Sequence, residues 1–99
     1  MSLYVWTRAL ESVASERARQ EALREAGRFQ YTPASHGVSD LQCFAMLAEE
    51  LGEVARQTLT QPDDAIAYDT AGSREDLRGE LIQVAAIATA WVERLDRAG

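Results

Sequence analysis

The sequence predicts an all-α domain in which three main helices form an antiparallel bundle. Two observations carry this prediction. Apolar residues recur at the spacing of an amphipathic helix in three separate stretches of the chain. Two segments that hold the only prolines, Pro33 and Pro62, divide these stretches. At 99 residues the chain suffices for one domain, residues 1–99, whose core is marginal in a monomer.

The first helix is expected from near Ser2 to about Arg28. From residue 16 to residue 21 its sequence turns polar, which permits two interpretations. The segment is either a solvated extension with charge pairs four residues apart, or a face that presents Arg17, Gln20 or Arg24 to a ligand. The apolar stripe of this helix consists of Leu3, Trp6, Leu10 and Val13.

The second helix is expected to begin at a cap formed by Ser39 or Asp40 and to run to roughly Leu59. Pro33 and Gly37 prevent a helix in the segment before it. The residues expected on its apolar face are Phe44, Leu47, Leu51 and Val54.

A loop from residue 60 to residue 72, in which residues 65–68 favour a helical turn, leads to the third helix. Ser73 is its expected N-cap, with Asp76 in the capping-box position, and the helix continues to about Arg97. This helix is apolar nearly all round, and such a helix should be buried on every side. Two neighbouring helices cannot surround it. We therefore expect a homodimer or homotetramer.

Composition excludes several classes of protein. The formal net charge is −6, and all ten basic residues are Arg, without a basic cluster that could follow a nucleic-acid backbone. The longest apolar run, residues 84–92, is too short to cross a bilayer, and no signal peptide opens the chain. The lone Cys43 fits a reducing compartment and a small buried hydrophobe better than a nucleophile. These features predict a soluble cytoplasmic protein without nucleic-acid or membrane partners.

Two predicted helices carry acidic residues three and four positions apart, which places them on one helix face. If the helices pack antiparallel, several side-chain oxygens converge, and their negative charges repel unless a cation neutralises them. Carboxylate oxygens suit Mg²⁺ or Mn²⁺. An alternative to a metal site stays open, namely that the acidic residues form two solvent-exposed helix surfaces without a ligand. The candidate metal ligands are Glu49, Glu50, Glu53, Asp76, Glu80 and Gln83.

The motif Glu49-Glu50-Leu51-Gly52-Glu53, followed by Glu80-Leu81-Ile82-Gln83, resembles the signature of the MazG-like all-α nucleoside triphosphate pyrophosphohydrolases. That signature is Glu-Glu-x-x-Glu on one helix and Glu-x-x-Asp on the next. The segment from residue 16 to residue 20 also resembles the first helix of small members, many of them bacterial or phage-encoded. The resemblance covers roughly residues 13 to 95.

The resemblance implies a hydrolase that cleaves nucleoside triphosphates between the α and β phosphates, with Mg²⁺ as cofactor, and so removes unwanted nucleotides from the pool. It implies Glu49, Glu50, Glu53 and Glu80 as metal ligands, with Glu50 and Glu53 as the catalytic residues. The candidate contacts to phosphate or base are Arg17, Gln20, Arg24 and Arg28.

Gln83 departs from the family pattern, because members usually carry Asp at this position. A Gln amide supplies a neutral oxygen, and Asp76, one turn earlier on the same flank, is a candidate replacement ligand. Two alternatives to the enzyme therefore stay open. One is a catalytically weakened protein of this kind that binds nucleotide or metal. The other is a helical oligomerisation module whose acidic flanks are only surface.

Overall fold

A computed structural model describes residues 3–59 and 71–98 of the chain. It contains α1 (Leu3–Glu25), α2 (Asp40–Leu59) and α4 (Ala71–Ala98), and the described ranges hold no strand. The all-α prediction is confirmed. The helical turn predicted for residues 65–68 lies outside the described residues.

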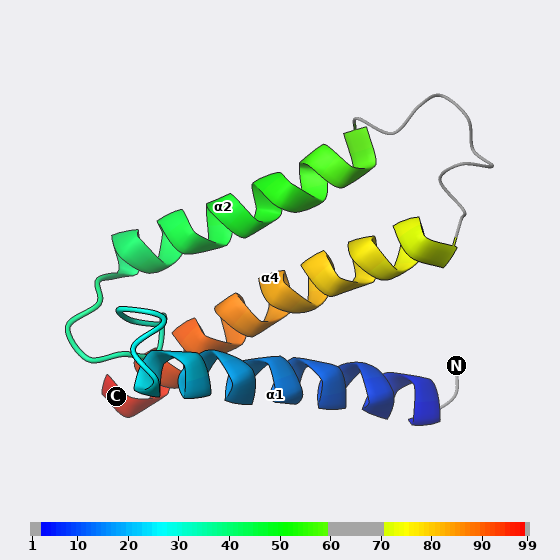
Figure 1. Ribbon diagram of the computed structural model, residues 1–99. Helices are drawn as coiled ribbons and strands as arrows, with labels where there is room; N and C mark the ends of the chain where they lie inside the picture. Colours follow the sequence, from blue (N-terminus) through cyan, green and yellow to red (C-terminus); the bar gives the residue numbers. More distant parts are fainter. Residues whose placement is uncertain (1–2, 60–70, 99) are drawn as a thin grey trace.

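The long helix α4 lies between the other two helices (Figure 1). It packs against α1 on one side and against α2 on the other, whereas α1 and α2 do not pack against each other. The helix α2 runs antiparallel to both neighbours, and α1 and α4 run in the same direction (Figure 1). This arrangement leaves α4 flanked by helices without being enclosed by them.

The end of α1 and the start of α2 are fixed by local hydrogen bonds. Helix α1 ends at Glu25 and not at the predicted Arg28, because Gly27 adopts a positive φ of 78°. The amide of Gly27 donates to the Arg24 carbonyl (3.0 Å) and that of Arg28 to the Leu23 carbonyl (2.8 Å), which is a Schellman ending.

At the start of α2, Ser39 is the N-cap that the sequence predicts. The Ser39 Oγ accepts from the Gln42 amide (3.1 Å), and the Gln42 Oε1 accepts from the Ser39 amide (2.8 Å). This reciprocal pair is a capping box. The prediction for Ser73 was wrong: α4 begins at Ala71, so Ser73 lies inside the helix.

The core of the described chain consists of small residues. Cys43 and Pro33 are fully buried, and the Cys43 thiol lies 3.6 Å from the Pro33 carbonyl oxygen, to which it donates. The prediction that Cys43 is a small buried hydrophobe is confirmed. This contact anchors the loop between α1 and α2 onto the start of α2. The other buried apolar side chains are Ala34, Val38, Ala86 and Ala90.

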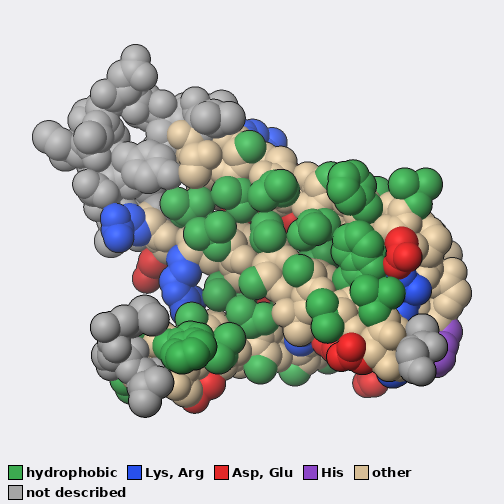
Figure 2. Space-filling view, turned by 180° about the vertical axis from the view of Figure 1, so that it is seen from behind, with side chains coloured by type: hydrophobic (Ala, Val, Ile, Leu, Met, Phe, Trp, Pro, Cys, Tyr) green, Lys and Arg blue, Asp and Glu red, His purple; other side chains and the backbone are tan. Residues whose placement is uncertain are grey.

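Large hydrophobic side chains lie mostly outside this core. Helix α4, expected to be buried on every side, exposes about half of Leu81 (48%), Val92 (54%) and Leu95 (48%) within a single chain. Figure 2 shows hydrophobic side chains gathered over much of one face of the molecule. Other exposed large hydrophobic residues are Tyr4, Val5, Trp6, Leu10, Leu41, Phe44 and Leu51.

Among the described helices, none combines the length and the apolar character needed to cross a lipid bilayer.

Candidate functional site

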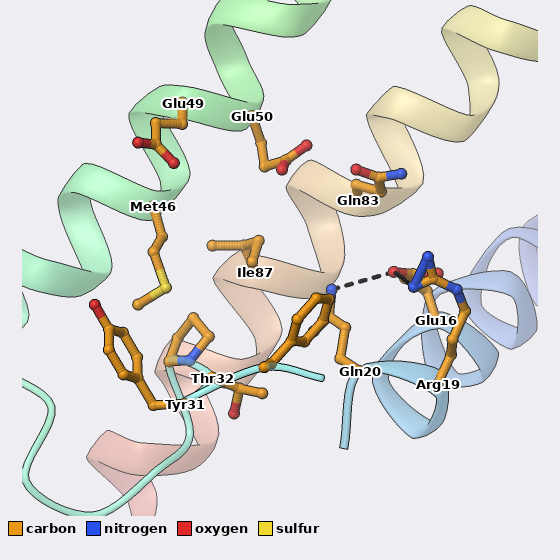
Figure 3. A pocket seen from close by; sticks show the side chains of 12 residues that line it. Glu16, Arg19, Gln20, Tyr31, Thr32, Met46, Glu49, Glu50, Gln83 and Ile87 are labelled. Carbon is orange, nitrogen blue, oxygen red and sulfur yellow. Dashed lines mark hydrogen bonds and ion pairs between the residues drawn. The ribbon is translucent and has the colours of Figure 1, made fainter. Parts of the chain in front are cut away.

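A cavity of about 330 Å³ opens where all three helices meet the loop between α1 and α2 (Figure 3). Its carboxylates and amides come from three helices, and its aromatic rings come from the loop. Segments far apart in the sequence therefore build one site. The side chains that line it are Glu16, Arg19, Gln20, Phe29, Tyr31, Thr32, Pro33, Met46, Glu49, Glu50, Gln83 and Ile87.

One end of the cavity is acidic. Glu49 and Glu50 reach it from α2, and the Glu50 side chain points across towards α4, where Gln83 lies (Figure 3). Glu16 reaches it from α1, held by a hydrogen bond that Gln20 Nε2 donates to its Oε2 (3.3 Å). The packing of α2 against α4 thus brings the two halves of the acidic motif together, as the sequence predicts.

Glu50 lies at the centre of these negative charges. Burial raises the pKa of Glu50, and the charges of Glu80, Glu53, Glu49 and Glu16 raise it further, in that order. Ionised Glu50 is therefore disfavoured by its surroundings. We call these five residues the acidic cluster: Glu16, Glu49, Glu50, Glu53 and Glu80.

Two carboxylate oxygens of the acidic cluster lack partners. The Oε2 atoms of Glu50 and Glu80 are buried, and neither accepts a hydrogen bond from the described residues. A buried acceptor without a donor costs about 1–3 kcal/mol, and more when it is charged. Carboxylate oxygens whose negative charge is not compensated are ligands that fit Mg²⁺ or Mn²⁺.

The side chains are not arranged around a complete coordination sphere. Within the described ranges, no three or more His, Cys, Asp or Glu side chains form a group that could hold a metal ion. Glu53, half-buried on α2, does not line the cavity and instead pairs with Arg56. The carboxylates would have to turn towards a common centre for an ion to bind.

The opposite end of the cavity is apolar. The Tyr31 ring, the Met46 thioether and Ile87 gather there (Figure 3), and Pro33 also lines the cavity. Phe29 contributes a second aromatic ring from the same loop. Aromatic and aliphatic side chains of this kind are complementary to a flat apolar group.

A second network of charged residues joins α1, α4 and the loop beside the cavity, and every member of it has a partner. The Arg17 Nε donates to Glu93 Oε2 (2.6 Å), its Nη2 to Glu93 Oε1 (2.9 Å) and to Glu21 (2.9 Å), and its Nη1 to Gln20 (3.1 Å). Glu21 also accepts from the Thr32 hydroxyl (2.7 Å). We call these five residues the Arg17 clamp: Arg17, Gln20, Glu21, Thr32 and Glu93.

The pKa directions agree with this bonding. Burial alone would raise the pKa of Glu21, but hydrogen bonds from Thr32, Arg24 and Arg17 outweigh it and lower that pKa to about 2. The hydrogen bond from Arg17 lowers the pKa of Glu93. The Arg17 clamp therefore stabilises its own carboxylates in the ionised form.

The predicted substrate contacts separate into two groups. Gln20 lines the cavity, whereas Arg17 and Arg24 bond to Glu21, and the exposed Arg28 does not reach the cavity. The structure thus places Arg17 in the clamp instead of at a ligand. Asp76 is exposed on α4 and does not line the cavity either.

Sequence reasoning missed Glu16 and Arg19, which are the other cavity residues of α1. A usable signal existed for Glu16, since it precedes the predicted Gln20 by four residues and therefore shares its face. Phe29 carried no signal, because a loop residue reaches a site only through the tertiary fold.

Comparisons with known proteins identify no relative: no family model matches the chain, and no curated protein or solved structure is significantly similar to it.

Proposed function

We propose that this chain is a Mg²⁺-dependent nucleoside triphosphate pyrophosphohydrolase of MazG-like type, which releases pyrophosphate and a nucleoside monophosphate. The observation that carries the proposal is Glu50, whose buried Oε2 has no donor among the described residues and whose acidic neighbours all raise its pKa. A divalent cation would relieve both unfavourable features. The acidic motif that resembles the MazG-like signature supplies the reaction class.

The residues of the cavity divide into roles by their chemistry. Glu49, Glu50 and Glu80 would hold the cation with Glu53, and Gln83 would add a neutral oxygen. Bound there, Mg²⁺ would supply charge neutralisation at the triphosphate and an activated water.

Two further parts of the cavity would position the substrate. Arg19, at the rim on α1, would bind phosphate oxygens through its guanidinium group. The aromatic rings of Phe29 and Tyr31 would receive the base at the apolar end, which excludes water from it. Gln20 is held towards the cavity by the hydrogen bonds that link it to Arg17 and Glu16.

The proposal includes a second copy of the chain as the partner that covers the exposed apolar faces. The buried core holds only small side chains, whereas Trp6, Phe44 and Leu51 are more than half exposed at 53%, 60% and 54%. Apolar exposure on this scale exceeds what a monomer of this size normally tolerates. A homodimer or homotetramer would supply the missing burial, and light scattering measures its mass.

The test of the enzyme is pyrophosphate release from a panel of nucleoside and deoxynucleoside triphosphates in the presence of Mg²⁺. We expect turnover with at least one nucleotide, and a loss of about 100-fold or more in Glu50→Gln. Glu11→Gln is the matched control, because it removes the same charge from an exposed position of α1 outside the cavity. Turnover that survives Glu50→Gln, or is equally reduced in Glu11→Gln, would contradict the proposed site.

Two observations favour a second candidate, a protein that binds nucleotide or metal without efficient hydrolysis. Gln83 stands where a charged ligand is usual, and the described side chains do not form a ready coordination group. Thermal stabilisation by Mg²⁺ or by a nucleotide without pyrophosphate release would identify this binder. If the protein shows neither thermal stabilisation nor turnover, that result would indicate the helical oligomerisation module.

A further inference from the structure

A second cavity, of about 230 Å³, lies between the loop and the last turns of α4, and its charge is opposite to that of the first. It is lined by His36, Gly37, Arg94 and Arg97, so the part of the chain that the structure describes contributes no carboxylate to its lining. We propose that this cavity binds a phosphate group. The proposal is independent of the function of the acidic cluster, since the two cavities share no lining residue.

Two carboxylates close to this cavity along the chain, those of Asp40 and Glu93, already accept hydrogen bonds. The Asp40 Oδ1 accepts from the Trp91 indole (2.9 Å) and from the Arg94 guanidinium. Both oxygens of Glu93 accept from Arg17. Arg97 makes no hydrogen bond or ion pair with the described residues, although its charge acts on the Glu93 carboxyl and helps to lower the pKa of that group.

The guanidinium of Arg94 is also incompletely bonded. Its Nη2 bonds to Asp40, but its buried Nε donates to no atom in the described part of the chain. An unpaired buried N–H costs free energy, more so on a charged group. The cavity is thus lined by two guanidinium groups that lie three residues apart on one face of α4.

The guanidinium groups and the volume of the cavity indicate which anion it binds. Two guanidinium groups suit the several oxygens of a phosphate, which accept paired N–H donors. The volume lies below the roughly 300 Å³ at which pockets for drug-sized ligands begin, so a whole nucleotide does not fit inside. The ligand is therefore inorganic phosphate or the phosphoryl end of a larger molecule.

The loop side of the cavity depends on backbone conformation. Gly37 has a φ of 79°, a region that residues with a Cβ rarely adopt, and it shapes the turn that carries His36. The imidazole of His36 therefore belongs to the same cavity lining as the two arginines. It offers an N–H donor to the same anion.

The experiment is titration of the full chain with inorganic phosphate in EDTA, followed by ³¹P NMR line broadening and by calorimetry. EDTA removes divalent cations, so the acidic cluster does not contribute. We expect saturable binding by the wild-type protein, which Arg97→Gln weakens about tenfold because one charge-assisted donor group is lost. Arg8→Gln, the matched charge control on exposed α1, should bind as the wild type does.

Further variants and ligands separate the outcomes. Glu50→Gln should leave phosphate binding unchanged, which distinguishes this site from the proposed catalytic one. If adenosine monophosphate binds more strongly than phosphate, and Arg97→Gln still weakens this binding, the ligand is the phosphoryl end of a larger molecule. If the two bind equally, the ligand is the free phosphate ion. Binding that does not saturate, or that Arg8→Gln and Arg97→Gln reduce equally, would overturn the proposal, because net charge alone would then explain it.

Discussion

The Arg17 clamp and the acidic cluster are two charged networks within one small domain, and they differ in whether their charges are compensated. In the clamp, Arg17 bonds to both Glu93 and Glu21, and the pKa of each carboxyl is lowered. In the acidic cluster, the pKa of Glu50 is raised, and two buried oxygens lack donors within residues 3–59 and 71–98. The clamp therefore compensates its own charges within the described residues, whereas the acidic cluster keeps a negative charge that we propose a cation neutralises.

Breaking the clamp should have the largest effect on stability. Arg17→Gln removes a guanidinium whose side chain is only 9% exposed, which leaves Glu93 without its ion-pair partner and Glu21 with Arg24 alone. We expect a loss of about 3 kcal/mol in the free energy of unfolding, at the lower end of what breaking a buried ion pair costs. The loss is not larger because Glu93, at 44% exposure, can partly recover solvation. Urea denaturation measures it. A loss below about 0.5 kcal/mol, the range of exposed ion pairs, would show that the clamp is not structural.

The next effect concerns acid stability. Because the pKa of Glu21 is about 2 in the folded protein and near 4.5 ordinarily, the unfolded chain takes up the proton first as the pH falls. The stabilising contribution of Glu21 is therefore present above about pH 5 and is lost progressively towards pH 2.

Glu21→Gln should destabilise the protein by about 1–2 kcal/mol at pH 7 and flatten the acid limb of the stability curve. Chemical denaturation at a series of pH values measures both quantities. An acid limb of unchanged steepness in this variant would assign acid denaturation to other carboxylates.

The acidic cluster should respond in the opposite direction. Since the pKa of Glu50 is raised, its ionisation above the ordinary pKa of a carboxyl destabilises the fold, and stability is lost as the pH rises. Without metal at pH 7, Glu50→Gln should therefore stabilise the protein, by about 0.5–1 kcal/mol. It should also abolish the stabilisation that Mg²⁺ gives the wild type. Thermal unfolding with and without Mg²⁺ tests both, and destabilisation by this variant would show that Glu50 is compensated in solution.

The smallest effect sharpens the link between the clamp and the loop. Thr32→Val is nearly isosteric and removes the hydroxyl that donates to Glu21 and accepts from the Ala34 amide (3.2 Å). We expect a loss of about 1 kcal/mol in stability, together with a pKa of Glu21 closer to its ordinary value. Carboxyl NMR titration measures that pKa. A Glu21 pKa that stays near 2 would mean that the two arginines alone account for it.

How far the sequence predicted these features follows from the range of the interactions involved. Ser39 was identifiable as a cap because its partner Gln42 lies three residues away. The local pattern at Ser73 also indicated a cap, but α4 already begins at Ala71. The approach of Glu50 to Glu80 followed from periodicity on two packed helices. The sequence did not show that Arg19 lines the cavity and that Arg17 does not, because this difference depends on the tertiary contact of Arg17 with Glu93. That the chain forms a homodimer or homotetramer stays a prediction.

The anchoring of the loop has a consequence for how ligand preference can change. Thr32 is tied to α1 through Glu21, and Pro33 is tied to α2 through Cys43, so the backbone at these two positions is fixed independently of its neighbours. Phe29 and Tyr31 lie just before this anchor, exposed by 39% and 37%, and neither belongs to the core. Selection or engineering can therefore exchange these two side chains at little cost in folding, which makes them the natural positions at which to redirect the cavity towards a different ligand.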